Sequence, residues 1–169
     1  ARCGMAASLT TGNKKYVDVE REIQQLLKST NALQNKLLDQ VRAAAEGFQP
    51  LSRAYANPRE DPTRAAVLQS AAETACTAPL EIMALCAAAL SAAGRLAEIG
   101  SRLAVSDAGC AAAILRGALE AAALNVLVNT KTMTDRSAAD HLNARCFALL
   151  EQGRTDGERI FCAVRDQLG

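Results

Sequence analysis

The chain has 169 residues, a formal net charge of +1 and 22% charged residues. Half of its residues are hydrophobic, but only 3% are aromatic and none is Trp. The apolar content is therefore mostly Ala and Leu, which favour helix over sheet. A chain of this length forms one domain with a core, so we expect a single all-α domain over residues 1–169. The charges are spread out rather than gathered in blocks, which excludes the basic footprint of a nucleic-acid-binding protein.

The sequence predicts neither a membrane protein nor a metalloprotein. No apolar run reaches the roughly 20 residues needed to cross a bilayer, and the first residues lack the regions of a signal peptide. We therefore expect a cytoplasmic protein. The six cysteines occur singly, with no C-x-x-C pair and no neighbouring His, which gives metal binding little support.

The first predicted elements are a short helix and a long one. The short helix ends at Leu9, and residues 10–13, reading TTGN, form a turn after it. Apolar residues then recur at intervals of three and four over residues 19–55, which is typical of one amphipathic helix. Pro50 lies inside this pattern, where its missing N–H predicts a bend rather than an end.

A second long helix is predicted after a break at residues 57–62, which read NPREDP. Asp61 is placed to cap this helix and Pro62 to occupy its first position. The pattern continues to Ile99, with a second bend expected at Pro79.

Two further helices complete the prediction. Ser106 and Asp107 are placed to cap the third helix, whose small residues allow close approach of a neighbour. Asp135 is placed to cap the last helix, which Gly153 and Gly157 are expected to weaken near its middle. The long segments together predict a bundle of long, kinked, antiparallel helices.

Familiar catalytic motifs are absent, since there is no glycine-rich phosphate loop, no G-x-S-x-G, and only one histidine, His141. His141 lies beside Asp140, in the setting of a solvated side chain. Four groups of polar residues remain as candidates for a functional site. They are a basic loop, the start of the third helix, a pair of asparagines and the lysine beyond them: Lys14, Lys15 and Tyr16; Ser106 and Asp107; Asn125 and Asn129; Lys131.

The residues alone leave these candidates open. Asp107 either caps its helix by accepting backbone N–H groups or faces a ligand. Asn125 and Asn129 share one apolar helix face, so their amides need either a neighbouring helix or a polar ligand as partner. Lys14 and Lys15 are most simply solvated loop charges.

Four segments carry a resemblance to a known family: MAASLTTGNKKY (5–16), APLEIMALC (78–86), VSDAGCAAA (105–113) and LNVLVNTKTMTD (124–135). In this order and spacing they resemble the formimidoyltetrahydrofolate cyclodeaminase and methenyltetrahydrofolate cyclohydrolase family, over nearly the whole chain. The resemblance implies an all-helical homodimer that binds a tetrahydrofolate derivative. One family reaction closes formimidoyl-folate to methenyl-folate with loss of ammonia, and the other adds water to methenyl-folate to give formyl-folate. Neither requires a metal or redox cofactor.

The resemblance also implies roles for the candidates. Asp107 would be the catalytic residue, either holding the pterin by charge-assisted hydrogen bonds or carrying a proton. The two lysines would neutralise the glutamate carboxylates of the folate tail, with the tyrosine along the ligand. The implied substrate-binding residues are Lys14, Lys15, Tyr16, Ser106, Asn125 and Asn129.

One distance argues against a single pocket for all of them. Asp107 and Asn125 lie on the same predicted helix, about 27 Å apart at 1.5 Å per residue. Either the asparagines are structural, or an antiparallel dimer brings one subunit's asparagines near the other's Asp107.

The sequence also departs from the family pattern. A glycine-rich P-G-G-G-S segment is expected before Met5 and is missing, and the acidic motif D-A-E-A-F reads AAEGF, so that Ala44 replaces a carboxylate. The alternative to an enzyme is therefore a catalytically inactive folate-binding or structural helical dimer of the same fold. If the protein is an enzyme, we expect a polar cleft containing Asp107 with Lys14 or Lys15. If it is a scaffold, we expect these groups to pair internally. Without an attached formiminotransferase domain, we favour the cyclohydrolase reaction.

Overall fold

The computed structural model describes residues 1–12 and 14–169, and within these ranges every regular element is a helix. This confirms the all-α prediction. The elements in chain order are α1 (Arg2–Ser8), the 3₁₀ turn η1 (Lys14–Val19), α2 (Glu20–Tyr55), α3 (Arg64–Ile99), the 3₁₀ turn η2 (Arg102–Ala104), α4 (Val105–Thr130) and α5 (Arg136–Leu168).

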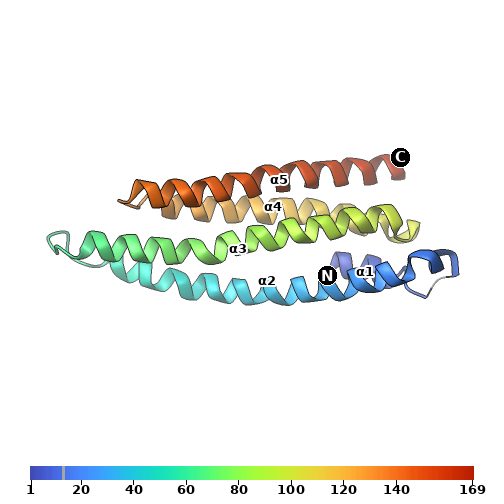
Figure 1. Cartoon of the computed structure of the whole chain (residues 1–169), viewed down its shortest axis with the longest axis horizontal. Coiled ribbons are helices and arrows are strands. Elements are labelled where there is room, and N and C mark those ends of the chain that lie inside the picture. Colours follow the sequence, from blue (N-terminus) through green and yellow to red (C-terminus); the bar gives the residue numbers. More distant parts are fainter. Residues whose placement is uncertain (13) are drawn as a thin grey trace.

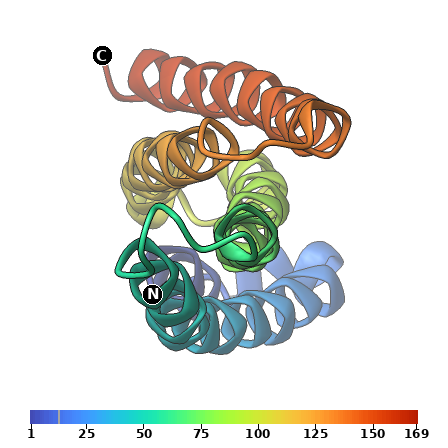
Figure 2. The same ribbon diagram turned by 90° about the vertical axis from the view of Figure 1, so that its left-hand side faces the viewer.

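The four long helices form an elongated up-and-down bundle (Figure 1). Seen along its length, α3 and α4 lie side by side between α5 on one side and α2 on the other (Figure 2). The short helix α1 fills part of the space between α2 and α4 at one end of the bundle, where it packs against both. The antiparallel bundle predicted from the sequence is confirmed.

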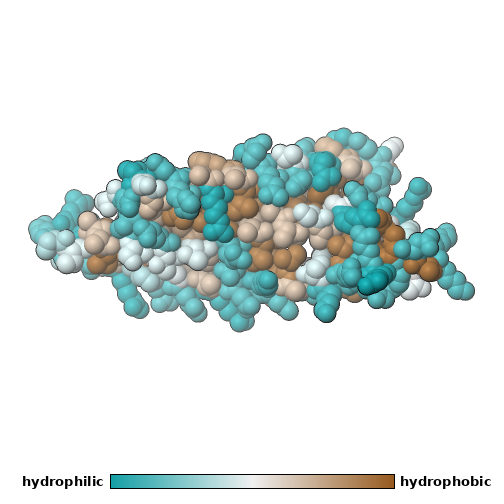
Figure 3. Space-filling model, viewed as in Figure 1, coloured by the Kyte–Doolittle hydropathy of each residue, from teal (hydrophilic) through white to brown (hydrophobic). Residues whose placement is uncertain are grey.

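The core depends on α3, which packs against α2, α4 and α5. Much of its buried surface is alanine, so the neighbouring helices approach closely along its length. Leu80, Met83, Leu90 and Leu96 supply the bulky buried side chains. Hydrophilic residues cover much of the face shown in Figure 3, and apolar residues appear along its middle.

Both internal prolines are accommodated without ending their helices. α2 continues through Pro50 and α3 through Pro79. Figure 1 shows α2 as a bowed helix, as expected where a proline removes one backbone hydrogen bond.

The predicted starts of two helices are wrong. Asp61 does not cap α3, because its Oδ1 accepts hydrogen bonds from the Thr63 backbone N–H at 2.8 Å and from the Thr63 hydroxyl at 2.7 Å. This local turn delays the helix, so α3 begins at Arg64 rather than at Pro62.

At the start of α5 the prediction is confirmed, since Asp135 accepts from the Ala138 N–H at 3.0 Å.

The start of α4 also differs from the prediction. Ser101 caps the turn η2 by accepting from the Leu103 N–H at 3.3 Å, and η2 leads directly into α4 at Val105. Ser106 and Asp107 therefore lie inside the first turn of α4, and no side chain caps this helix. The predicted capping role is wrong because the chain already turns at Ser101.

A buried threonine ties the first turn region to this connection. The Thr10 hydroxyl donates to the Ala6 carbonyl at 2.9 Å and accepts from the Ser101 N–H at 2.8 Å. Gly12 supplies the positive φ of 77° that the predicted turn needs. Asn13, the last residue of that predicted turn, lies outside the described residues. The threonine fixes the end of α1 against the α3–α4 connection.

The glycines of α5 mark close contacts with α4. A Cβ atom at Gly153 would overlap Leu119 Cδ1, and one at Gly157 would lie 2.9 Å from Arg116 Cβ. The helix is continuous through both, so the expected weakening does not interrupt it. These glycines let α4 and α5 approach each other.

Four of the six cysteines are buried: Cys3, Cys76, Cys86 and Cys146. Burial raises the pKa of the Cys76 thiol and that of the Cys86 thiol to about 11. Among the described residues no group of three or more His, Cys, Asp or Glu side chains is arranged to hold a metal ion.

By length and composition alone, two helices are apolar enough to span a membrane, although no apolar run of that length was expected from the sequence. They are Arg64–Ile99 and Arg102–Thr130, whose most apolar windows are 67% and 33% buried in the bundle. Alanine-rich composition gives core helices this property, which accounts for α3. The low burial of α4 means that one of its faces remains uncovered.

Candidate functional site

Asp107 lies where the first turn of α4 faces α1. Arg2, the first residue of α1, donates from Nη1 to Asp107 Oδ1 at 2.7 Å. The Asp107 side chain is 13% exposed and the Arg2 side chain 53%. Within the described chain Arg2 is the hydrogen-bond partner of Asp107, so the carboxylate is fixed through one oxygen. Sequence reasoning did not identify Arg2.

The predicted basic loop lies at the same end of the bundle. Lys14, Lys15 and Tyr16 begin η1, and both lysines are exposed. The Tyr16 hydroxyl accepts a hydrogen bond of 3.4 Å from the Arg102 N–H. This bond places the loop beside the turn η2, which leads into the first turn of α4.

Ser106 is adjacent to Asp107 and exposed, so its hydroxyl is open to solvent. Arg2, the basic loop, Ser106 and Asp107 lie at the same end of the bundle, and we call these residues the η1–α4 cluster. Its basic side chains come from two elements, Arg2 from α1 and Lys14 and Lys15 from η1, and Arg2 contacts the Asp107 carboxylate. An arrangement of this kind suits a ligand that carries carboxylates at one end.

The two asparagines lie much farther along α4. The Asn129 amide donates to the Ala75 carbonyl of α3 at 3.2 Å and is buried. The Asn125 amide donates to the Ala121 carbonyl of its own helix at 3.4 Å and is exposed. Asn129 thus has the neighbouring-helix partner that a structural role requires. Lys131 follows the end of α4 and is exposed, as is His141 on α5.

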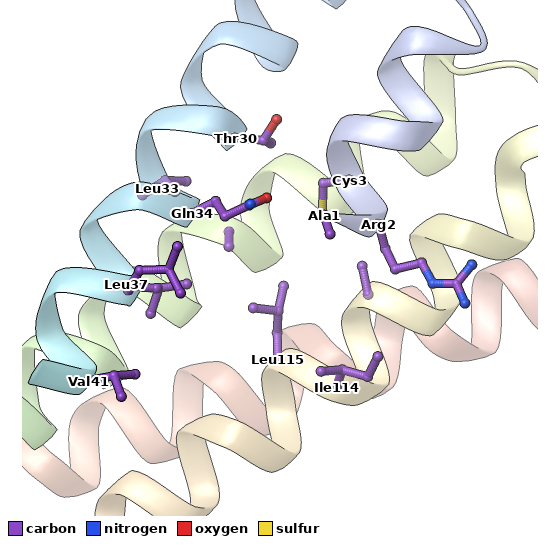
Figure 4. Close-up of a pocket in the computed structure, with 13 residues that line it drawn as sticks. Ala1, Arg2, Cys3, Thr30, Leu33, Gln34, Leu37, Val41, Ile114 and Leu115 are labelled. Carbon is purple, nitrogen blue, oxygen red and sulfur yellow. The ribbon is translucent and has the colours of Figure 1, made fainter.

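A cavity of about 310 Å³ opens next to Arg2, between α1, α2 and α4. Figure 4 shows aliphatic side chains of α2 and α4 facing it, while the Arg2 guanidinium extends away toward α4. The lining is predominantly apolar and includes Leu33, Leu37, Val41, Ile114 and Leu115. In a sequence, aliphatic residues at helical spacing indicate the buried face of a helix. The hydrophobic pattern therefore gives no sign that these residues surround a cavity.

The predicted polar cleft is not found in either described cavity. The first is apolar, and the second lies between α2 and α3 near Pro50, away from the η1–α4 cluster. Neither contains Asp107, Lys14 or Lys15. In a single chain the cluster is therefore an open surface beside an apolar cavity.

Known proteins resemble this chain over nearly its whole length. The family model described as formiminotransferase-cyclodeaminase matches residues 1–148. A methenyltetrahydrofolate cyclohydrolase from Methylorubrum extorquens is 34% identical over 172 aligned residues, covering 99% of this chain and 83% of that protein. The formimidoyltransferase-cyclodeaminase of Sus scrofa is 28% identical over 95% of this chain, which spans 30% of that larger protein.

A solved structure gives the same fold. The formiminotetrahydrofolate cyclodeaminase of Thermotoga maritima superposes with a TM-score of 0.83, covering 99% of this chain and 79% of that one, at 24% identity. At 24% sequence identity, this match shows the fold alone. Taken with the family model and the relative at 34% identity, the sequence and the fold agree: this chain belongs to the formiminotransferase-cyclodeaminase family.

Proposed function

We propose that this protein is a folate one-carbon enzyme that hydrolyses methenyltetrahydrofolate to formyltetrahydrofolate. The relative with 34% identity, which this chain covers to 83%, is named for this activity. Cyclisation of formimidoyltetrahydrofolate with release of ammonia is the second candidate, since three further relatives carry the cyclodeaminase name. The observation that carries the proposal is the carboxylate of Asp107, which Arg2 holds at the end of the bundle where the basic loop also lies.

The chemistry needs one proton acceptor and a negative charge in the right place. In the methenyl substrate one carbon joins two nitrogens and shares their positive charge. Water adds to this carbon and loses one proton to give a hydroxyl group. The hydroxyl then loses its proton as one carbon–nitrogen bond breaks, and the departing nitrogen takes up a proton, which leaves a formyl group. In this proposal Asp107 stabilises the cationic carbon or accepts the proton. The carbon keeps its oxidation state, so the reaction needs no redox cofactor, and the proposal includes no metal.

The direct test is an absorbance assay. Purified protein is mixed with methenyltetrahydrofolate at a pH where spontaneous hydrolysis is slow, and loss of the methenyl absorbance is compared with a blank without protein. Acceleration supports the cyclohydrolase. Without acceleration, formimidoyltetrahydrofolate is tried as substrate, and failure with both folates contradicts the enzyme proposal. We place the reaction in the cytoplasm as part of the same proposal.

The alternative to either enzyme is an inactive scaffold, and two observations favour it. Asp107 is paired internally with Arg2, as a scaffold predicts. Ala44 on α2 stands where the family pattern has a carboxylate. A scaffold that retains the ligand site binds folate without turnover. Binding in a calorimetric titration with tetrahydrofolate, together with no turnover in the absorbance assay, would identify such a scaffold.

Lys14 and Lys15 are proposed to bind the glutamate tail of the folate. Replacing both by Ala should raise the KM for a polyglutamate substrate about fivefold, because two partly solvated charge pairs contribute about 1 kcal/mol together. The KM for the single-glutamate substrate should change less. The matched control is the double variant Lys28→Ala with Lys36→Ala, which removes two exposed lysines of α2 and so the same number of positive charges. An equal change in KM for both substrates contradicts the assignment.

We further propose that the uncovered face of α4 is the interface of a homodimer. Ile114, Leu124 and Val128 are 63%, 68% and 57% exposed on this face. The exposed residues from position 110 to position 128 carry no charge: Cys110, Ala113, Ile114, Gly117, Ala118, Ala121, Leu124, Asn125 and Val128. An uncharged face meets a second copy of itself without repulsion, and its small residues allow close helix packing. We call these residues the α4 face.

The dimer also bears on the site. Within one subunit Asn125 lies about 27 Å from Asp107 along α4, at 1.5 Å per residue. In an antiparallel α4 pair, Asn125 of one copy approaches the η1–α4 cluster of the other. This gives Asn125 a route to the substrate that a single chain does not offer, whereas Asn129 is buried against α3.

Substitution of Leu124 by Arg should convert the dimer into a monomer, because it places a charge in the middle of an apolar contact. Light scattering coupled to size exclusion measures the mass. The matched control is Phe147→Arg, a similarly exposed apolar residue on α5 at 52% exposure. A monomeric wild-type protein contradicts the proposal, and co-flotation of the wild type with lipid vesicles would instead assign the face to a membrane.

A further inference from the structure

The ion pair between Arg2 and Asp107 joins two elements that are far apart in the chain. Their separation is 105 residues, and the Nη1–Oδ1 distance is 2.7 Å. The pair is asymmetric, since the carboxylate is mostly covered and the guanidinium is half exposed. Other ion pairs of the described residues lie on the outer surface of the bundle, with both side chains at least 27% exposed.

We propose that Arg2 is a positioning residue for Asp107, which it holds through Oδ1 so that the carboxylate meets the folate as an ionised acceptor through Oδ2. This inference rests on the proposed folate reaction. It applies to both roles left open for Asp107, holding the pterin by charge-assisted hydrogen bonds or accepting a proton, because each uses a carboxylate oxygen as an acceptor.

Packing fixes the backbone on both sides of the pair. Cys3, Ala6 and Ala7 of α1 are buried in the same apolar cluster as Ala111, which lies one helical turn after Asp107. The far end of α1 is held by the hydrogen bond from the Ser101 N–H to the Thr10 hydroxyl. Arg2 therefore extends from a helix that cannot easily shift against α4, and its guanidinium reaches Asp107 from a defined direction.

The chemistry of the two groups decides the role. A guanidinium has only donors, so the Oδ1 atom that it contacts acts as the acceptor of this ion pair. With Oδ1 engaged, Oδ2 has no hydrogen bond within residues 1–12 and 14–169. It is the oxygen available to a donor of the ligand or to the attacking water.

The charge of Arg2 predicts a characteristic kinetic effect. The methenyl substrate is a cation, so a guanidinium beside Asp107 does not favour its binding. Removing the guanidinium should leave KM unchanged or lower, because the negative charge of Asp107 is then less compensated. The same change should lower kcat, because the carboxylate loses its fixed orientation.

The experiment compares Arg2→Met, Arg2→Lys and wild type in the methenyl hydrolysis assay. Arg2→Met keeps the length and apolar contacts of the side chain but removes its donors, and kcat should fall about tenfold without a rise in KM. Arg2→Lys restores one charged donor and should recover most of kcat. The control is Arg154→Met, which removes an arginine paired with Glu120 at 3.0 Å on the α4–α5 side; its kcat should stay at the wild-type value.

A double variant completes the test. On an Asp107→Asn background, Arg2→Met should lower kcat no further, because Arg2 acts through Asp107. Additive losses, unchanged kcat in Arg2→Met, or equal kcat in the Met and Lys variants would each overturn the inference. If the wild type hydrolyses the substrate and only these results fail, the Arg2 role alone is wrong. If the wild type turns over neither folate, the proposed function is wrong and the Arg2 role with it.

Discussion

Asp107→Asn is expected to lower kcat for methenyltetrahydrofolate hydrolysis about 100-fold, because a positioned proton acceptor contributes at least this factor. The variant should remain folded. Asp107 makes no capping hydrogen bond to the start of α4, and its ion pair with a half-exposed arginine contributes at most about 1 kcal/mol to stability. Steady-state kinetics and thermal unfolding of the same preparation separate the two effects.

The control for this experiment removes a carboxylate that belongs to an ordinary surface ion pair. Glu98→Gln meets this condition, since Glu98 is exposed and paired with Arg95 at 2.9 Å on α3. Its kcat should equal that of the wild type. Full activity in Asp107→Asn would show that the carboxylate has no part in the reaction, whatever its position beside the basic loop.

Gly153→Ala is expected to reduce the free energy of unfolding by about 2 kcal/mol, although Ala is the better helix former by about 1 kcal/mol. The reason is the contact between α5 and α4. A Cβ at this position would overlap Leu119 Cδ1, and Leu119 is fully buried, so neither helix can yield without disturbing the core. Urea unfolding followed by circular dichroism measures the change.

The same substitution at another helical glycine should act in the opposite direction. A Cβ at Gly47 of α2 would lie 3.7 Å from the Thr74 carbonyl oxygen, which is ordinary contact. Gly47→Ala should therefore stabilise the protein by about 0.5–1 kcal/mol through helix propensity. If Gly153→Ala were stabilising to the same extent, α4 and α5 would not pack as closely as described.

The order and lengths of the helices follow from the sequence because hydrophobic spacing and helix-forming residues agree over long segments. Pro50 and Pro79 were correctly predicted to lie inside helices. The starts of α3 and α4 were misplaced because competing turns precede them. Asp61 hydrogen-bonds Thr63 instead of a helix N-terminus, and Ser101 turns the chain before Ser106 is reached. Such competition depends on local geometry that residue preferences do not encode.

Only part of the candidate site was accessible from the sequence. Tyr16 and Asp107 were among the polar residues singled out in the sequence, and the hydrogen bond of Tyr16 to Arg102 brings η1 to the end of the bundle where α4 begins. Arg2 was not found, because a pairing across 105 residues leaves no periodic signal in the chain. The apolar cavity was missed for a related reason: Leu37 or Leu115 looks the same in a sequence whether it faces a neighbour or a space.

The cysteines differ in burial, so their rates of alkylation report on both dimer formation and unfolding of the bundle. Alkylating reagents attack the thiolate, so Cys86, with its pKa at about 11 and its side chain in the core, reacts only when the bundle opens. Cys110 is exposed on the α4 face and should be modified at once in a single chain, but slowly at protein concentrations where two copies associate. A mass-spectrometric time course over a dilution series would therefore record dimer dissociation and core unfolding separately, without any introduced label.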